Sequence, residues 1–331
     1  MTAADGTLIA ASPAESYGPP VQVRGLVKRY GKLTAVAGVD LTVEPGDVYG
    51  YLGPNGAGKT TSLRMMLGLI RPTEGTVRLF GRDPQDSVRA LEGVAGFVEA
   101  PTFYPYLTGR RNLELLAAFD GHGAAGRIQS ALETVELSGR AGDRVGGYSH
   151  GMKQRLGIAA ALLRDPKLMI LDEPATGLDP AGMRDMRLLI RRLAGQGITV
   201  VLSSHLLAEV EELCNRVAIV RSGRIVYEGR IADLKRAAGA TYRLQTTDDD
   251  RALAVCHAQH GLRDVRTLHG RITFSADDQA VTELSQALVE AGALIRALVP
   301  ATATLEDLFF SLTEGEGAAP AVPEAEPVRA V

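Results

Sequence analysis

The segment from residue 53 to residue 61 carries the clearest chemistry in the chain, because it matches the pattern G-x-x-x-x-G-K-[ST] between an apolar segment and a helical one. Glycines there let backbone N–H groups converge on phosphate oxygens, and the positive end of the following helix adds to the attraction. Lys59 would reach the β- and γ-phosphates of a nucleotide, and the Thr60 hydroxyl would complete a Mg²⁺ site. The segment consists of Gly53, Pro54, Asn55, Gly56, Ala57, Gly58, Lys59, Thr60 and Thr61.

Two adjacent acids, Asp172 and Glu173, follow the apolar segment 168–171. This order puts both carboxylates at the carboxyl edge of a parallel sheet, where nucleotide sites form. Asp172 could hold Mg²⁺ through its water shell, and Glu173 could polarise a water for attack on the γ-phosphate. Taken alone, the pair is explained equally well by a strand that ends in an acidic turn. The phosphate loop elsewhere in the chain favours the catalytic and metal-binding roles.

Short apolar segments alternate with helical patterns from Val21 to about Arg230, which predicts a parallel-sheet core in an α/β fold. Buried strands are expected at 48–52, 96–98, 168–171 and 198–202, with a hairpin of 217–220 and 225–227 closing the domain. After about residue 240 we expect a small α+β unit with strands near 242–246 and 271–274. Helices at about 278–291 and 305–312 would complete it.

The composition excludes several classes of protein. The 331 residues are 45% hydrophobic with a net charge of −3 and no basic stripe, so no nucleic-acid partner is expected. Cys214 and Cys256 lie far apart without metal-ligand spacing, which indicates buried thiols in a reducing cytoplasm. No apolar run approaches the roughly 20 residues that span a bilayer, and residues 1–20 lack a signal pattern.

The segment 148–156, with the sequence YSHGMKQRL, resembles the signature of the ABC-transporter ATPase family. This resemblance implies that Ser149 and Gly151, at a helix N-terminus, face the γ-phosphate of ATP held by the other subunit of a dimer. The physical reason is again exposed N–H groups and a helix dipole directed at an anion. Ser149 without its neighbours would be a plain helix N-cap.

Three more residues match the family's motifs, in the family's order, over about Val21 to Arg230. The resemblance implies that Tyr30 stacks on adenine, that Asp179 belongs to the loop linking the two nucleotide sites, and that His205 is the switch histidine at the γ-phosphate. Each has a simpler explanation alone: packing for Tyr30, a cap before Pro180 for Asp179, and a helix start for His205.

Two residues depart from the family's commonest pattern. Glu99 stands where most members have a glutamine that helps bind Mg²⁺, and a carboxylate there should alter the affinity for the metal. His150 replaces the first paired glycine of the signature, at a steric cost if that position needs a positive φ angle. Both features resemble a subgroup associated with antibiotic export and antimicrobial-peptide immunity. The segment 304–310, TLEDLFF, is similar to the C-terminal unit of daunorubicin-resistance-type ATPases.

Aromatic residues concentrate at Phe103, Tyr104 and Tyr106 in a chain that has only 5% of them. Neither a strand nor a helix period explains the cluster, which favours an interface. The resemblance implies that these residues receive a coupling helix of the membrane subunit, while a locally packed subdomain edge is the alternative.

The resemblance implies an ATP-binding and ATP-hydrolysing subunit of a bacterial ABC exporter for an antibiotic or another amphipathic compound. It would use ATP and Mg²⁺, form a homodimer or heterodimer, and sit at the cytoplasmic face of the cell membrane through a separate permease. A peptide-immunity exporter ATPase and a soluble non-transport ABC ATPase are the alternatives. We expect a P-loop NTPase domain of the ABC type at 21–235, with a helical subdomain at about 100–165. A small α+β domain at 240–313 and tails at 1–20 and 314–331 complete the prediction.

Overall fold

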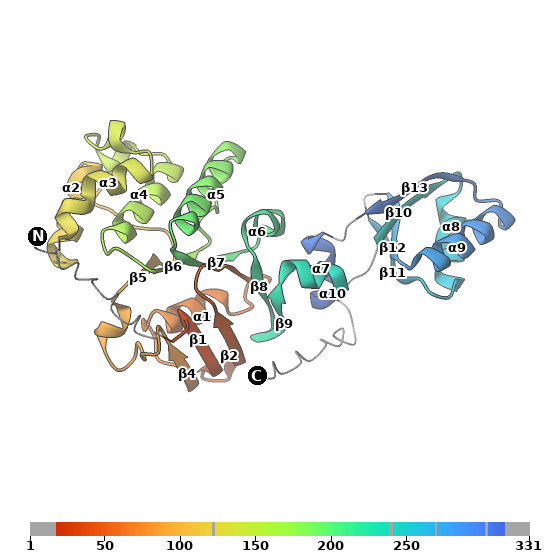
Figure 1. Ribbon diagram of the computed structural model, residues 1–331, viewed down its shortest axis with the longest axis horizontal. Helices are drawn as coiled ribbons and strands as arrows, with labels where there is room; N and C mark the ends of the chain where they lie inside the picture. Colours follow the sequence, from red (N-terminus) through yellow and green to blue (C-terminus); the bar gives the residue numbers. More distant parts are fainter. Residues whose placement is uncertain (1–17, 121–122, 238–240, 269, 302–303, 315–331) are drawn as a thin grey trace, which may run out of the picture.

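The computed structural model describes residues 18–120, 123–237, 241–268, 270–301 and 304–314. The two predicted tails lie almost entirely outside these residues. Figure 1 shows α2 (Gly109–Asp120), α3 (Ile128–Thr134) and α4 (His150–Leu162) at one end of the molecule, and a small separate domain at the other end. The sheets that carry the predicted site residues lie between them.

A six-stranded sheet with the order β5-β6-β7-β3-β8-β9 forms the centre of the larger domain. The first five of these strands are parallel, and β9 pairs antiparallel with β8, as the predicted hairpin requires. The strands are β3 (Val48–Leu52), β5 (Val94–Phe97), β6 (Leu168–Asp172), β7 (Thr199–Ser204), β8 (Arg216–Arg221) and β9 (Arg224–Arg230). The predicted parallel-sheet core is confirmed.

Alternate residues of this sheet face two different cores. In β6, Leu168 and Ile170 join the core on one face, whereas Met169 and Leu171 join the core on the other. A sheet buried on both faces needs strands that are apolar throughout, and all five residues of β6 are buried. Only the strand ends are therefore free to hold polar groups, which places Asp172 at the carboxyl edge.

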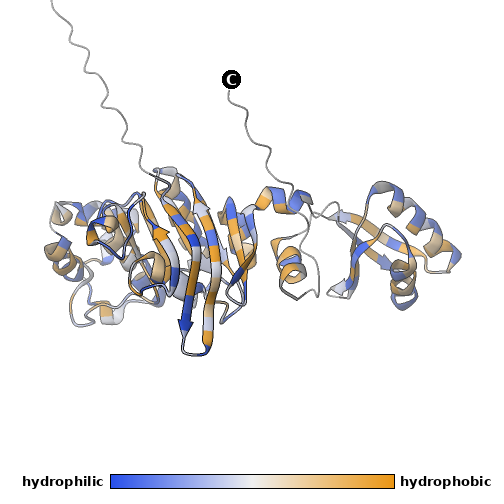
Figure 2. Ribbon diagram, turned by 90° about the horizontal axis from the view of Figure 1, so that it is seen from below, coloured by the Kyte–Doolittle hydropathy of each residue, from blue (hydrophilic) through white to orange (hydrophobic). Residues whose placement is uncertain are grey.

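An antiparallel sheet with the order β2-β1-β4 packs over α1 (Lys59–Met66). Its strands are β1 (Val21–Tyr30), β2 (Leu33–Val43) and β4 (Glu74–Arg78). Hydrophobic and hydrophilic residues alternate along the long central strands (Figure 2), as a sheet with one buried face requires.

Helices cover the other face of the central sheet. Besides α2, α3 and α4, they are α5 (Pro180–Gly195), α6 (Leu207–Leu213) and α7 (Ile231–Ala237). Short 3₁₀ helices lie at Val88–Leu91, Ala124–Arg127, Ser138–Arg140 and Val145–Gly147. Helices α2, α3 and α4 lie within the helical subdomain predicted at about 100–165 and contact one another. The predicted domain bounds stay a prediction.

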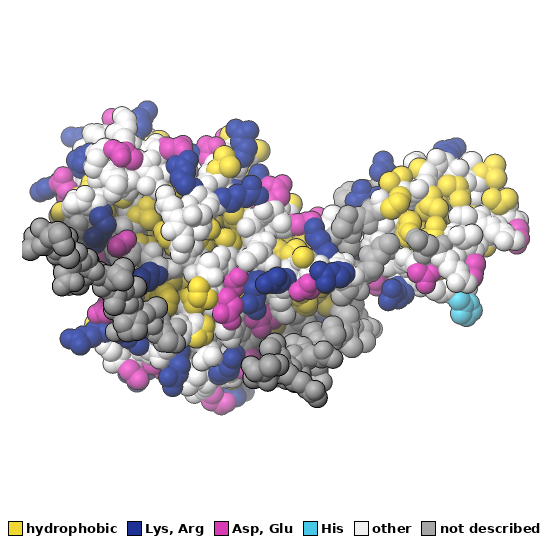
Figure 3. Space-filling model, in the orientation of Figure 1, with side chains coloured by type: hydrophobic (Ala, Val, Ile, Leu, Met, Phe, Trp, Pro, Cys, Tyr) yellow, Lys and Arg dark blue, Asp and Glu magenta, His cyan; other side chains and the backbone are white. Residues whose placement is uncertain are grey.

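The small domain is an antiparallel sheet with the order β11-β12-β10-β13, packed against two helices. Its elements are β10 (Thr241–Thr246), α8 (Asp249–Ala258), β11 (Arg263–Leu268), β12 (Arg271–Ser275), α9 (Asp278–Glu290) and β13 (Ile295–Ala301). Hydrophobic side chains also gather on an outer face of this domain (Figure 3). Val289, Leu294 and Val299 are more than half exposed, so the domain presents apolar groups to solvent.

The last helix, α10 (Leu305–Glu314), differs from the prediction that it completes the small domain. It contacts α6, α7 and β9, and Leu305 and Phe309 belong to the core of the larger domain. A link to the small domain is also present, since the Arg266 guanidinium of β11 donates to the Asp307 carboxylate at 3.2 Å. The Glu211 carboxylate of α6 accepts a hydrogen bond from the Leu305 N–H at 2.7 Å and pairs with Lys235 of α7. The apolar face of α10 thus indicated that the helix is buried. The domain against which it packs depends on contacts with residues about one hundred positions earlier in the chain, such as Glu211.

Candidate ATPase site

The phosphate loop connects β3 to α1, as the motif predicts, and its glycines are sterically required. Gly58 caps α1 with a φ angle of 95°, and a Cβ there would lie 2.3 Å from the Ala35 carbonyl oxygen. A Cβ at Gly53 would lie 2.6 Å from the carbonyl oxygen of Val220. Only glycine therefore fits these two positions, and the loop lies against β2 and β8 with its first-turn N–H groups at the start of α1.

Lys59 lies under this loop with 7% of its surface exposed. Its ammonium donates to the Gly53 carbonyl oxygen at 2.8 Å and lies 3.7 Å from Glu173 Oε1. A buried lysine needs such acceptors, since an unpaired charge is costly in the interior. The cation is thus held between the phosphate loop and the carboxyl edge of β6, where a phosphate would compete for it.

Three side chains from three elements meet beside the loop. The Thr60 hydroxyl of α1 donates to Asp172 Oδ2 at 2.9 Å, and the Ser203 hydroxyl of β7 donates to Asp172 Oδ1. Asp172 is only 5% exposed. Mg²⁺ prefers oxygen ligands, and it is usually held by one or two carboxylates together with phosphate and water. The donor set of Thr60 and Asp172 therefore fits Mg²⁺.

Glu99 is engaged elsewhere. Its carboxylate pairs with the guanidinium of Arg64 on α1, and its φ angle of 71° lies in the left-handed region. The negative charge that the sequence adds at this position is thus compensated by a cation. The metal role predicted for Glu99 stays a prediction.

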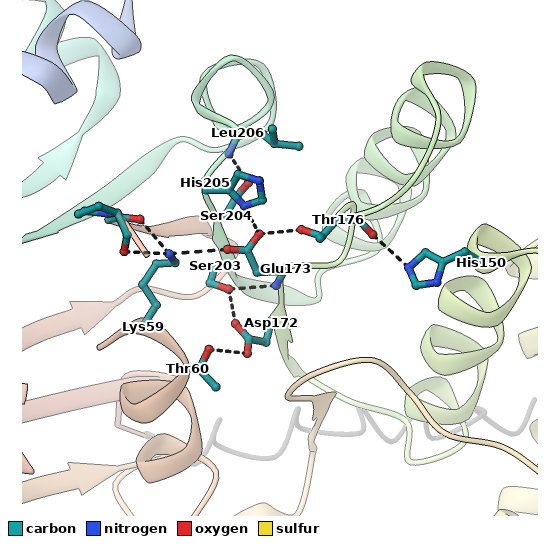
Figure 4. A network of polar contacts seen from close by, with 12 residues as sticks. Lys59, Thr60, His150, Asp172, Glu173, Thr176, Ser203, Ser204, His205 and Leu206 are labelled. Carbon is teal, nitrogen blue, oxygen red and sulfur yellow. Dashed lines mark hydrogen bonds and ion pairs between the residues drawn. The ribbon is translucent and has the colours of Figure 1, made fainter. Parts of the chain in front are cut away.

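Glu173 and His205 meet at the ends of β6 and β7, as Figure 4 shows. His205 Nδ1 lies 2.6 Å from Glu173 Oε2, and the Thr176 hydroxyl donates to the same oxygen at 2.8 Å. The Glu173 N–H donates to Ser203 Oγ at 3.0 Å, which fixes a residue whose φ angle is 50°. A carboxylate oriented in this way can accept a proton from a water molecule.

Two of these residues, Thr176 and Ser203, are absent from the predicted site. Ser203 lies on β7 two residues before the predicted His205, and Thr176 lies between Glu173 and Asp179. The available signal was a hydroxyl residue close in sequence to a predicted catalytic residue, Thr176 after Glu173 and Ser203 before His205. Their role depends on partners that only the fold brings together.

The signature segment begins α4. Ser149 is its N-cap and accepts from the Met152 N–H at 3.2 Å, so the capping role is present. His150 is the first residue of the helix and does not have a positive φ angle, so the condition for the expected steric cost is not met. Ser149, Gly151 and Asp179 line one hollow of about 540 Å³, and Asp179 caps α5 through the Gly182 N–H at 2.9 Å.

Tyr30 ends β1 and is 48% exposed, and the Lys28 ammonium lies 5.1 Å from the ring centroid. The exposed ring has a face that a base could stack on. Its adenine role stays a prediction.

The aromatic cluster divides into inward and outward residues. Phe103 packs against the core of the larger domain, whereas Tyr104 and Tyr106 are 55% and 66% exposed with ring centroids 5.8 Å apart. Asn112 of α2 holds the Tyr104 backbone through two hydrogen bonds of 2.9 and 3.1 Å. Phe119 of α2, which the sequence did not single out, is 90% exposed.

A phosphate loop, a buried acid at the end of β6, and a histidine at the end of β7 define an ABC-type ATPase site on this fold. Residues 36–176 match the family model described as ABC transporter. The chain is 37% identical over 301 residues to the bacitracin transport ATP-binding protein BcrA of Enterococcus faecalis, covering 90% of this chain and 98% of that one. The chain therefore belongs to the ATP-binding subunits of ABC transporters, which bind and hydrolyse ATP.

Other relatives extend this comparison. The daunorubicin/doxorubicin resistance ATP-binding protein DrrA of Streptomyces peucetius is 37% identical over 309 residues, covering 88% of this chain and 92% of its own. The solved structure of an ATP-binding subunit of an ABC transporter is 30% identical with a TM-score of 0.59, covering 65% of this chain and 92% of that one. A dimeric ATP-binding cassette bound to ADP and Pi is 25% identical with a TM-score of 0.58, covering 64% and 98%.

In the part of the chain that the structure describes, no helix is both long enough and apolar enough to cross a bilayer. Subunits of this family dimerise and function with separate membrane permeases.

Proposed function

We propose that this chain powers a bacterial antibiotic exporter by binding and hydrolysing MgATP as a dimer. The relatives named for bacitracin transport and for daunorubicin/doxorubicin resistance support an antibiotic as the cargo. The chain would sit at the cytoplasmic face of the membrane, held there by a separate permease. The exposed Tyr104 and Tyr106 support a permease contact at the helical subdomain, next to the inward-facing Phe103.

The observation that carries the proposal is the convergence of Lys59, Asp172, Glu173 and His205 at one sheet edge (Figure 4). Lys59 would bind the β- and γ-phosphates, and Tyr30 would stack on the base. Thr60 and Asp172 would hold Mg²⁺, which supplies positive charge to the phosphate oxygens when bound.

Hydrolysis follows from the same arrangement. Glu173 accepts a proton from the attacking water, while His205 fixes the carboxylate and approaches the γ-phosphate. Ser149, Gly151 and Asp179 of one subunit would complete the site of the other, because they line one hollow at the start of α4, where the helix dipole favours an anion. Closure of the dimer on ATP and its release after hydrolysis would drive the permease through differential affinity.

The experiment compares Lys59→Ala, Glu173→Gln and a control, Glu290→Gln, whose carboxylate lies exposed on α9. K59A should weaken ATP binding, measured by fluorescence titration, because the phosphate cation is lost. E173Q should bind ATP and lose roughly 10²- to 10⁴-fold in kcat, the usual contribution of a general base. E290Q should behave as the wild type. Normal turnover by E173Q would remove Glu173 from the base role.

The transport part needs a separate test. Tagged E173Q, held in its ATP-bound state, is used to retrieve partners from detergent-solubilised membranes of the host with MgATP. Recovery of a membrane protein with several spans supports the exporter. Recovery of ribosomes, DNA or soluble proteins alone would instead favour a non-transport ABC ATPase.

A further inference from the structure

His150, the residue that departs from the signature, makes a specific contact. Its Nε2 lies 3.1 Å from the Thr176 carbonyl oxygen, across from α4 to the loop after β6. A carbonyl oxygen only accepts hydrogen bonds, so His150 donates from Nε2. The ring also packs on Gly177, where a Cβ would lie 3.5 Å from the imidazole. The histidine thus lies against the loop that carries Glu173.

Thr176 holds Glu173 at two points. The Thr176 hydroxyl donates to Glu173 Oε2 at 2.8 Å, and the Thr176 N–H donates to the Glu173 carbonyl oxygen at 3.1 Å. Figure 4 shows His150, Thr176 and Glu173 in one continuous row of polar contacts, from the signature helix to the hydrolysis site. The row joins the signature helix, which would contact the ATP bound by the partner subunit, to Glu173, which would act on the ATP bound by its own subunit.

The Glu173 carboxylate lies between competing groups. His205 and Thr176 hold Oε2, while the Lys59 ammonium lies 3.7 Å from Oε1, beyond hydrogen-bonding distance. A carboxylate that turned toward Lys59 would form a close ion pair, and an ion-paired carboxylate is a weaker base. The Thr176 donor therefore opposes a rotation that would disable Glu173.

We propose that Thr176 and His150 are positioning residues for hydrolysis. Thr176 orients the Glu173 carboxylate, and His150 fixes Thr176 from the first turn of the signature helix. The inference rests on the general-base role proposed above for Glu173. It adds a link inside one subunit, since His150 is adjacent to Ser149, which is proposed to contact the partner's ATP.

The test measures kcat and KM for ATP in four single variants. Thr176→Val replaces the hydroxyl with a methyl group and should lower kcat about tenfold, the effect of one hydrogen bond, with KM changed less than about twofold. Thr176→Ser keeps the hydroxyl and should retain the wild-type kcat. His150→Ala should lower kcat, and His150→Gln, whose amide can donate to the same carbonyl, should restore most of it.

Two further variants complete the design. His257→Ala, at an exposed position on α8, is the matched control and should have wild-type kinetics. The double variant His150→Ala with Thr176→Val should be no slower than T176V alone, because His150 acts through Thr176. ATP affinity within about twofold of wild type in each variant verifies that the site is folded.

The outcomes separate the two proposals. A wild-type protein without ATPase activity overturns the proposed function and this inference with it. An active wild type whose T176V and H150A variants keep its kcat overturns this inference alone. It is equally overturned if H150Q is as slow as H150A, or if the losses of the two single variants multiply in the double variant.

Discussion

Replacing Leu305 by alanine tests whether the last helix belongs to the core of the ATPase domain. Its side chain is completely buried at the start of α10, in the core cluster that includes residues of β3, β6 and β7. A buried Leu→Ala change costs about 2–5 kcal/mol, from lost transfer energy and the cavity that remains. We expect about 3 kcal/mol, because α10 lies at the edge of this core and can partly relax.

The assay is calorimetric unfolding with and without MgATP. ATP binds only the folded ATPase domain, so the transition that rises in temperature with MgATP reports on that domain. For a domain of this size each kcal/mol shifts the midpoint by about 2–4 °C, so L305A should lower it by about 6–12 °C. Leu188→Ala, at a position on α5 that is 51% exposed, is the control and should shift it by less than about 2 °C.

One result would refute the reasoning. If L305A lowers a transition that does not respond to MgATP and leaves the responsive one unchanged, then α10 stabilises the small domain instead. The contacts of α10 with α6 and α7 would then contribute little to the stability of the ATPase domain.

Three further predictions follow from the site and the thiols. Gly58→Ala should weaken ATP binding about tenfold or more, by calorimetric titration, because the new Cβ meets a backbone oxygen at 2.3 Å and φ is 95°; Gly139→Ala, with open space around it, is the control. Glu99→Gln should raise the Mg²⁺ concentration for half-maximal ATPase activity by less than about tenfold, because the exposed Glu99 carboxylate also pairs with Arg64. Asp172→Asn should raise that concentration more than about tenfold. Equal effects of the two variants would contradict the assignment of Asp172 as the main carboxylate ligand of Mg²⁺. Burial raises the pKa of the Cys256 thiol from 9.0 to about 11, so less thiolate forms in the folded protein; alkylation at pH 8 should be about 100-fold slower than in the unfolded chain and should accelerate as pH rises toward 11. Equal rates in the two states would be inconsistent with that burial.

Local patterns predicted much of the fold. The apolar segment 168–171 is β6, and the segments 217–220 and 225–227 form the hairpin of β8 and β9. These elements follow from side-chain periodicity and turn residues close in sequence, which a single chain displays directly. The parallel order of the strands then placed Asp172 and the phosphate loop at one edge.

Partners distant in sequence were not predictable in the same way. Arg64 and Glu99 pair across 35 positions, and His205 meets Glu173 across 32. The motifs named Glu173 and His205 but gave no sign that Thr176 would share the same carboxylate oxygen. Such contacts depend on loop geometry, which the side-chain pattern does not encode.

The position of α10 also sets the order in which the domains can be completed during synthesis. Chains leave the ribosome N-terminus first, and Leu305 and Phe309 reach the core of the ATPase domain only after the whole small domain has been made. At about 5–20 residues per second this delay lasts several seconds. During this delay, the apolar surfaces of α6 and α7 that later contact α10 are exposed to solvent. The ATPase domain of each new chain therefore lacks part of its core until the small domain has been synthesised.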